Sequence, residues 1–352
     1  MSLFPVLGKA PAGLRLQRIR RSSNYNGKNF QNLVDTPVSR EGVSMFKMLR
    51  DLSRRPANTA PPKPIPSIHT DLQNLPDGEA SLVWFGHSSY LLKIDKVHIL
   101  VDPVFSGNAS PVSIFAKAFP GSNVYGVKDM PATIEAVLLT HDHYDHLDYK
   151  TILELKTRTK HFYTSLGVGA HLEYWGIEPE KITELDWWES TTLGDLTLTA
   201  TPGRHFSGRS LKRGGAIWSA FVLQASLSDH SRAGYRLFLG GDSGYEQHFK
   251  TIGDRFGPFD LAILECGQYN ENWPYIHMMP EETVQAAKDL KATTLMPVHW
   301  GKFTLAMHPW DEPVRRVTAA AARVGLPITT PRIGEIVKIN QHYPNEAWYD
   351  FL

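Results

Sequence analysis

The feature that most limits how this chain can fold is an apolar segment that runs directly into a cluster of ionisable side chains. Residues 134–139 are largely apolar, which predicts a strand buried on both faces of a sheet. Residues 140–146, Thr-His-Asp-His-Tyr-Asp-His, then carry three imidazoles and two carboxylates. Ionisable groups beside a buried strand are costly unless they are paired or bound to a metal. Because imidazole and carboxylate ligands suit zinc and related divalent ions, the segment predicts a metal-binding loop.

The spacing within this loop predicts two metal positions rather than one. On a tight loop that enters a helix, the alternate residues His141 and His143 can face one ion. The adjacent residues Asp145 and His146 can then face a second ion. One loop cannot complete two sites, so we expect further ligands from other strand ends.

Three other residues follow predicted strands in the same way. His205, Asp242 and His299 each have a glycine within two residues, at the strand ends that follow the segments 193–199, 235–239 and 294–298. Glycine lets the backbone approach a bound ion closely. Each residue taken alone is more typical of a structural polar group. Together with the 140–146 loop, the three are candidate metal ligands.

The first 77 residues differ in pattern from the rest of the chain. They contain a basic cluster (Arg15, Arg18, Arg20 and Arg21) and a proline-rich stretch at 56–66 that disfavours helix. We expect residues 1–77 to form a largely irregular arm that wraps over a main domain, with one short helix near 43–52. The basic cluster has two interpretations, a solvated surface or a contact with anionic lipid or a phosphate-bearing substrate.

Residues 78–352 show regular secondary-structure patterns and are expected to form one domain. Strands come first in clusters and then alternate with helices, which is typical of an α+β fold with sheets covered by helices. The predicted strands are 81–85, 90–94, 97–101, 134–139, 193–199, 216–223, 235–239, 261–265, 294–298 and 333–339. The predicted helices are 166–174, 280–290 and 313–324.

Composition excludes several classes of protein. The 352 residues include 37 Lys and Arg against 36 Asp and Glu, so binding to nucleic acid through overall positive charge is not expected. The single cysteine, Cys266, excludes an intrachain disulfide and is expected to be a buried, inert thiol. No apolar run approaches the ~18 residues that span a bilayer, and we expect a cytoplasmic protein.

The ordered set of candidate ligands resembles the metallo-β-lactamase superfamily. His141-x-His143-x-Asp145-His146 is followed by a single His, a single Asp and a last His, in that order. The resemblance covers about residues 80–340 and implies an αββα sandwich with a dinuclear site at one edge. It implies two divalent ions, with zinc the first expectation and manganese or iron as alternatives. By the family pattern His141, His143 and His205 hold one ion, Asp145, His146 and His299 hold the other, and Asp242 bridges both.

A narrower resemblance is to the branch that contains N-acyl-phosphatidylethanolamine phospholipase D and L-ascorbate-6-phosphate lactonase. It is carried by the strings at 84–89, 100–106, 241–245, 277–282 and 298–301. This resemblance implies a dinuclear metal hydrolase that acts on a phosphodiester of the N-acyl-phosphatidylethanolamine kind. The alternative is a lactonase or carboxylic ester hydrolase. Asp145 and Asp242 are then expected to orient the nucleophile. His277 is the candidate general acid or oxyanion donor, or else a packing histidine.

Several neighbouring residues carry weaker expectations. Asp102 ends a predicted strand and is a candidate acceptor from a ligand histidine, and His87 has a similar place in a turn. Five aromatic residues could line an apolar substrate groove or belong to the core, and they are Trp273, Tyr275, Trp300, Phe303 and Trp310. The expected partners are a small-molecule or phospholipid substrate, with peripheral membrane contact. A homodimer is the default oligomeric state.

Overall fold

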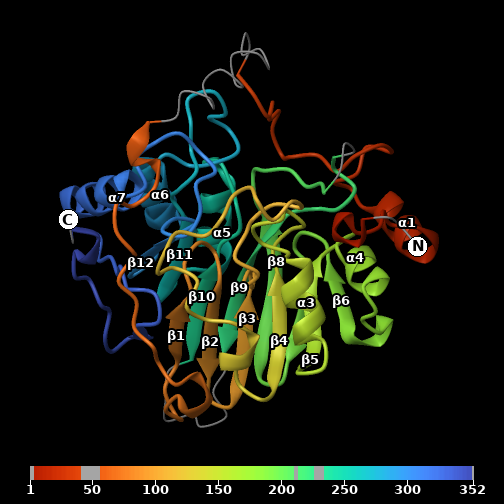
Figure 1. Cartoon of the computed structure of the whole chain (residues 1–352). Coiled ribbons are helices and arrows are strands. Elements are labelled where there is room, and N and C mark those ends of the chain that lie inside the picture. The colour runs from red at the N-terminus through yellow and green to blue at the C-terminus, as the bar shows by residue number, and fades with distance from the viewer. Residues whose placement is uncertain (1–3, 41–55, 210–212, 226–233, 351–352) are drawn as a thin grey trace.

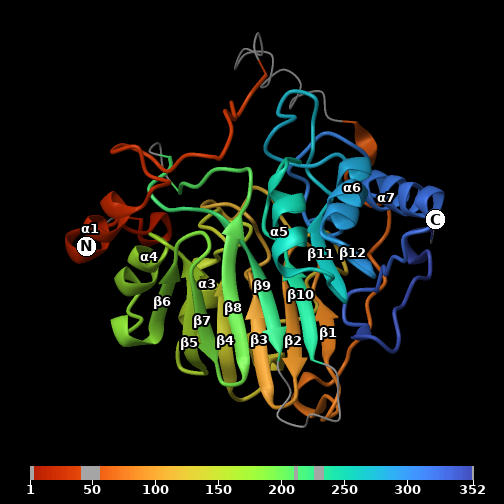
Figure 2. The same cartoon turned by 180° about the vertical axis from the view of Figure 1, so that it is seen from behind.

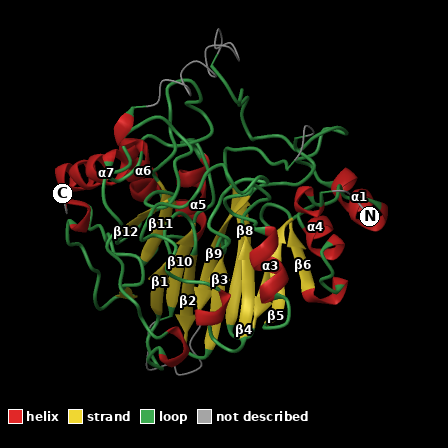
Figure 3. Cartoon of the chain, in the orientation of Figure 1, coloured by secondary structure: helices red, strands yellow, loops and turns green. Residues whose placement is uncertain are grey.

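Two β-sheets packed face to face form the centre of the molecule (Figure 1). The computed structural model describes residues 4–40, 56–209, 213–225 and 234–350. The helix expected near residues 43–52 lies outside the described residues. Figure 3 shows the strands gathered in the middle, with helices on the outside of both sheets. This is the expected αββα sandwich. Most residues of its strands are buried between the two sheets or beneath the helices.

The first sheet has seven strands in the order β13-β1-β2-β3-β4-β5-β6. The strands β1 to β3 form an antiparallel meander, and β3 to β6 are parallel to one another. The bounds are β1 (Ser81–Trp84), β2 (Tyr90–Ile94), β3 (Val97–Val101), β4 (Ile134–Leu139), β5 (Thr159–Ser165), β6 (Ile182–Leu185) and β13 (Ile336–Lys338).

The second sheet has six strands in the order β12-β11-β10-β9-β8-β7. Its strands β7 to β10 are antiparallel, and β10, β11 and β12 are parallel. The bounds are β7 (Ser190–Leu193), β8 (Leu196–Pro202), β9 (Ser219–Ala225), β10 (Tyr235–Leu239), β11 (Leu261–Glu265) and β12 (Leu295–Val298). Strands β8, β10, β11 and β12 therefore point the same way, so their carboxyl ends meet at one edge.

Helices cover the outer faces of both sheets (Figures 1 and 2). The helices α3 (Tyr149–Leu155) and α4 (Gly169–Tyr174) lie on the first sheet, and α5 (His248–Phe256), α6 (Pro280–Asp289) and α7 (Glu312–Val324) on the second. Helix α7 shows why: Val314, Val317 and Ala321 are buried at a spacing of three and four residues, which makes one apolar face. It ends at Gly325, whose φ of 68° closes the helix.

The structure contains elements that the sequence pattern did not predict. Strands β5, β6 and β7 and helices α3 and α5 are examples. Helix α5 contains Gly253, which disfavours helix formation, but a Cβ there would lie 2.0 Å from the carbonyl oxygen of Asp289. Packing against α6 therefore requires glycine at this position, although glycine has a low helix propensity. The predicted strand 333–339 is shortened to three residues, 336–338.

The arm is less irregular than expected because it includes helix α1 (Gly13–Arg21). This helix carries the basic cluster, and two of its arginines form ion pairs with the main domain. Arg15 contacts Glu173 at 2.7 Å and Glu184 at 2.6 Å, and Arg18 contacts Glu189. These two arginines are thus partners of the fold rather than a free basic surface. Among the described helices, none is long and apolar enough to cross a membrane.

Candidate metal centre

Three histidine nitrogens converge on one point at the shared edge of the two sheets. His143 Nδ1 lies 3.0 Å from His141 Nε2 and 3.2 Å from His205 Nε2. His141 and His143 follow β4, and His205 follows β8, so the first sheet supplies two of the nitrogens and the second supplies one. Burial lowers the pKa of His141 and of His205 well below the usual value, so their rings are neutral. Their nitrogen lone pairs are therefore available to a cation.

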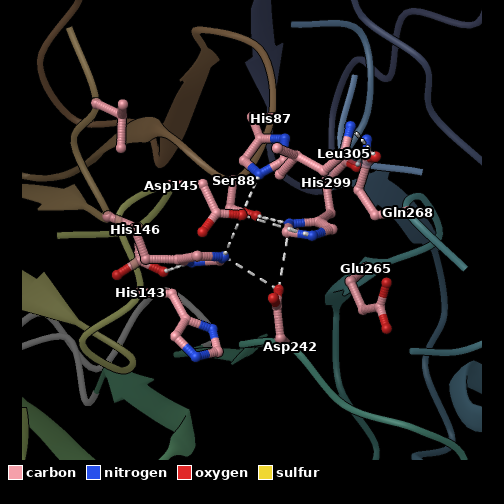
Figure 4. Close-up of polar contacts among 12 residues, drawn as sticks. His87, Ser88, His143, Asp145, His146, Asp242, Glu265, Gln268, His299 and Leu305 are labelled. Carbon is pink, nitrogen blue, oxygen red and sulfur yellow. Dashed lines mark hydrogen bonds and ion pairs between the residues drawn. The ribbon is translucent and has the colours of Figure 1, made fainter. Parts of the chain in front are cut away.

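A second group of metal-capable side chains lies beside the first (Figure 4). It consists of His87, Asp145, His146 and His299, whose candidate ligand atoms lie within 4.8 Å of one another. Oδ2 of Asp145 lies 3.7 Å from His146 Nε2 and 3.9 Å from His299 Nε2. This group brings together the three residues that the family pattern assigns to a second ion, and it adds His87.

Asp242, at the end of β10, lies between the two groups. Its Oδ2 is 3.8 Å from His141 Nε2 and 3.7 Å from His205 Nε2. Its Oδ1 is 3.1 Å from His146 Nε2 and 3.2 Å from His299 Nδ1. Each oxygen of this one carboxylate thus faces a different group. All seven sequence-predicted ligands therefore lie in one place.

The chemistry of this place fits divalent metal ions. Among the described residues, His146 Nε2 and Asp242 Oδ1 are buried without a hydrogen-bond partner, although they face each other. Burial alone would raise the pKa of Asp242, but the nearby imidazoles, His146 foremost, hold it well below its usual value. Carboxylates and neutral imidazoles are ligands that a zinc-type ion binds. Such an ion would also satisfy the buried atoms that lack a hydrogen-bond partner.

Further contacts orient the candidate ligands from behind. Asp102 Oδ2 lies 2.7 Å from His146 Nδ1, which is the role that the sequence suggested for this aspartate. His205 Nδ1 donates to the carbonyl oxygen of Ile276 at 2.8 Å, and His141 Nδ1 lies 3.1 Å from Thr140 Oγ1. Such partners set which ring nitrogen faces the metal.

His87 directly contacts candidate ligands of the second group. Its Nε2 lies 2.9 Å from Asp145 Oδ2, and its ring centroid is 4.0 Å from that of His299. The backbones of His87 and His299 are also paired, since His299 N donates to His87 O at 3.0 Å. Both residues have positive φ, 54° and 68°, a strained conformation that tends to persist at functional sites.

His277 lies at the rim of the centre. Its ring centroid is 5.1 Å from that of His205 and 5.3 Å from that of His299. Its Nδ1 lies 3.3 Å from Oε1 of Glu265, a buried carboxylate that the sequence reasoning did not single out. Burial raises the pKa of Glu265 to about 7. The signal for Glu265 was available, because it closes the otherwise apolar strand β11.

Other residues near the centre have structural roles. Asp142, inside the motif, turns away, since it accepts from Gly208 N at 2.7 Å and contacts His171 Nε2 at 3.3 Å. Cys266 is fully buried, and burial raises the pKa of its thiol well above the usual value.

The aromatic groove was one of two interpretations, and for most of its residues it is wrong. Trp300, Phe303 and Trp310 are buried, because they pack in the interior instead of facing a substrate. Tyr275 is exposed, and the guanidinium of Arg204 lies 4.8 Å from its ring centroid. Trp273 is half-buried, with its Nε1 donating to Gln268 O.

Comparison with known proteins agrees with this geometry. Residues 98–300 match the family described as Beta-lactamase superfamily domain, and the chain belongs to the metallo-β-lactamase superfamily. It is a metal-dependent hydrolase of that superfamily.

Individual relatives cover most of the chain. An uncharacterized protein of Mycobacterium tuberculosis is 38% identical over 344 residues, which span 94% of this chain and 88% of that protein. N-acyl-phosphatidylethanolamine-hydrolyzing phospholipase D 1 of Caenorhabditis elegans is 30% identical over 241 residues, 63% of this chain and 64% of that protein. The solved structure of Igni18, a metallo hydrolase from Ignicoccus hospitalis, has a TM-score of 0.56 at 20% identity, covering 75% of this chain and 99% of that one. This last likeness is one of fold.

Proposed function

We propose that this protein is a dinuclear metal hydrolase that cleaves a phosphodiester, in a phospholipid of the N-acyl-phosphatidylethanolamine kind. The observation that carries the dinuclear part is the position of Asp242, whose two oxygens each face a separate group of histidines. The similarity to a phospholipase D that acts on such lipids supports the substrate class.

The chain's residues divide into two ligand sets. His141, His143 and His205 would hold one ion, and Asp145, His146 and His299 the other, with Asp242 shared. Zinc is the proposed metal because its ligands in proteins are imidazole and carboxylate groups such as these. When bound, two such ions activate water as a nucleophile and polarise a phosphoryl or carbonyl oxygen.

Two side chains would position and move protons. Asp145 is held by His87 at its Oδ2, so this carboxylate is oriented to accept a hydrogen bond from the attacking water. His277 faces Glu265 with Nδ1, which leaves Nε2 for the oxygen of the leaving group. Burial by itself would lower the pKa of His277, but the carboxylate of Glu265 outweighs it and raises the pKa. A protonated imidazole there would suit a general acid.

Exposed apolar side chains support a lipid substrate. The segment between β3 and β4 exposes Ile114 and Phe115, at 67% and 61% of their surface. This segment follows the carboxyl end of β3, and Asp102 of the metal centre also follows that strand end. Peripheral contact with a bilayer through these exposed side chains would suit a phospholipid substrate.

The test begins with elemental analysis of the purified protein beside hydrolysis of bis(p-nitrophenyl) phosphate, with and without chelator. About two metal ions per chain and chelator-sensitive turnover are expected, followed by turnover of N-acyl-phosphatidylethanolamine in mixed micelles. A His141→Ala variant is the matched negative control. Two ions with no phosphodiester turnover, but with turnover of a lactone panel, would replace the phosphodiester by a carboxylic ester. Absence of metal after reconstitution would overturn the centre itself.

A further inference from the structure

Asn32, in the N-terminal arm, contacts the metal centre at His205. The side-chain amide of Asn32 binds the backbone of His205 on both sides: Nδ2 donates to His205 O at 2.8 Å, and His205 N donates to Oδ1 at 3.0 Å. Trp218 Nε1 also donates to Oδ1, at 3.2 Å. Asn32 and His205 are 173 residues apart in the chain. A single amide thus holds both backbone polar groups of a candidate ligand.

Only one orientation of this amide satisfies its neighbours. Oδ1 faces two N–H donors, from His205 and Trp218, and Nδ2 faces one carbonyl oxygen. A rotated amide would place its NH₂ group against two donors and its oxygen against an acceptor. The hydrogen-bonding pattern therefore defines the orientation of Asn32, and the geometry requires both an acceptor and a donor on this side chain.

The chain on either side of Asn32 is anchored independently. Before it, Phe30 is buried and packs in a small apolar cluster with Ile19, Trp187 and Trp218. Phe30 N also donates to the carbonyl oxygen of Gly214 at 3.0 Å. This contact brings the arm to the loop between β8 and β9, because Gly214 and His205 both lie in that loop.

After Asn32, the arm is held by the residue that precedes the ligand. Arg204 Nε donates to Thr36 Oγ1 at 3.1 Å, and Arg204 also donates to the carbonyl oxygen of Asp35 at 3.3 Å. The guanidinium further donates to Tyr245 O at 3.2 Å, which ties the same loop to the segment that follows β10. Residues 30–36 therefore cannot shift without moving the loop that carries His205.

We propose that Asn32 is a positioning residue for the ligand His205, so that arm residues 30–36 are part of the metal centre. The proposal rests on the proposed function only in that His205 holds an ion. The side chain of His205 is oriented at Nδ1 by Ile276 O, and its backbone is oriented by Asn32. Both are needed to aim Nε2 at the point that it shares with His141 and His143.

The experiment compares metal affinities of full-length variants. Asn32→Ala is expected to weaken binding of one zinc ion by about 10- to 100-fold, with the second ion less affected. Affinities are measured by competition of the purified, metal-stripped protein with a chromogenic zinc chelator. Asn24→Ala is the matched control, because Asn24 Nδ2 also joins the arm to the domain, at 3.0 Å from Asp186 Oδ1, without contacting His205.

A second variant separates the donor from the acceptor. Asn32→Asp keeps an oxygen for His205 N and Trp218 Nε1 but places an oxygen against His205 O, where no hydrogen bond can form. It is expected to lose zinc affinity as Asn32→Ala does, with circular dichroism like that of the wild type. Far-UV spectra and Tm of the metal-free proteins show whether each variant is folded.

The zinc affinities of the Asn32 and Asn24 variants decide whether Asn32 is a positioning residue. Unchanged zinc affinity in Asn32→Ala, or an equal loss in Asn24→Ala, would overturn the positioning role, because the arm would then matter only as a whole or not at all. A selective loss in the Asn32 variants supports it. Failure of the wild type to cleave phosphodiesters would leave this result standing, because the readout is metal affinity and not turnover.

Discussion

Asp102 Oδ2 lies 2.7 Å from Nδ1 of His146, and both side chains are fully buried. The carboxylate also accepts from Thr140, at 2.9 Å from the backbone nitrogen and 2.6 Å from Oγ1. This contact keeps the proton of His146 on Nδ1, so Nε2 is left to face Asp242 at 3.1 Å. Asp102 therefore decides which nitrogen of His146 is available to a metal ion.

Asp102→Asn is expected to lower zinc affinity by about 10- to 100-fold at one position, because an amide can donate to Nδ1 and so favours the wrong tautomer of His146. Competition with a zinc chelator measures this loss. Asp95→Asn is the control, since Asp95 has a positive φ of 51° as Asp102 has one of 39°, but Asp95 is exposed in the turn between β2 and β3. Equal affinity in the two variants would contradict the role of Asp102.

Asp242→Ala is expected to remove both ions, whereas His143→Ala removes one. The reason is that Asp242 faces both groups of histidines. His143 instead contacts His141 and His205, the other two histidines of the first group. Elemental analysis of the two purified variants gives the metal content per chain. If Asp242→Ala still bound one ion per chain, this carboxylate would not bridge the two ions.

His277→Ala is expected to keep both ions and to lower kcat by about 10²- to 10⁴-fold, the usual effect of losing a general acid. His277→Gln, which keeps a hydrogen-bond donor, should recover part of the rate if the residue acts as an oxyanion donor. Metal content and turnover are measured on the same preparations. Loss of an ion would instead make His277 a ligand, as its closeness to Asp242 and His299 allows.

Lys302 makes folding stability depend on pH. Its buried ammonium donates to the carbonyl oxygens of Phe85 and Val104, and burial lowers its pKa to about 7. Unfolded lysine titrates near ~10.4, so between pH 7 and that value the unfolded state binds more protons. The contribution of Lys302 to the free energy of unfolding therefore rises with pH across this window.

Lys302→Met should remove that dependence. The difference in unfolding free energy between the wild type and the variant is expected to change by on the order of a few kcal/mol between pH 6.5 and 9.5. Urea denaturation at several pH values, with metal removed from both proteins, measures it. A difference that stays constant with pH would mean that folding does not lower the pKa of Lys302.

Much of the fold followed from local pattern. The strands β2, β3, β4, β10 and β11 were predicted at their observed bounds, because each is a short apolar run between turn residues. Strand β5 was missed because its first half, with Lys160 and His161, is polar, and only pairing between β4 and β6 makes it a strand. Helix α5 was missed because Gly253 is selected by contact with α6 and not by helix propensity.

By itself the sequence determined the ligand types and their places at strand ends, since periodicity and residue chemistry are local properties. It also indicated the superfamily, through the order of seven histidines and aspartates. Only the tertiary structure decided that Asp242 lies between two groups, that Glu265 faces His277 and that Asn32 holds His205. These relationships join segments far apart in the chain. They depend on which strands pair and where the arm docks, and long-range packing alone supplies that information.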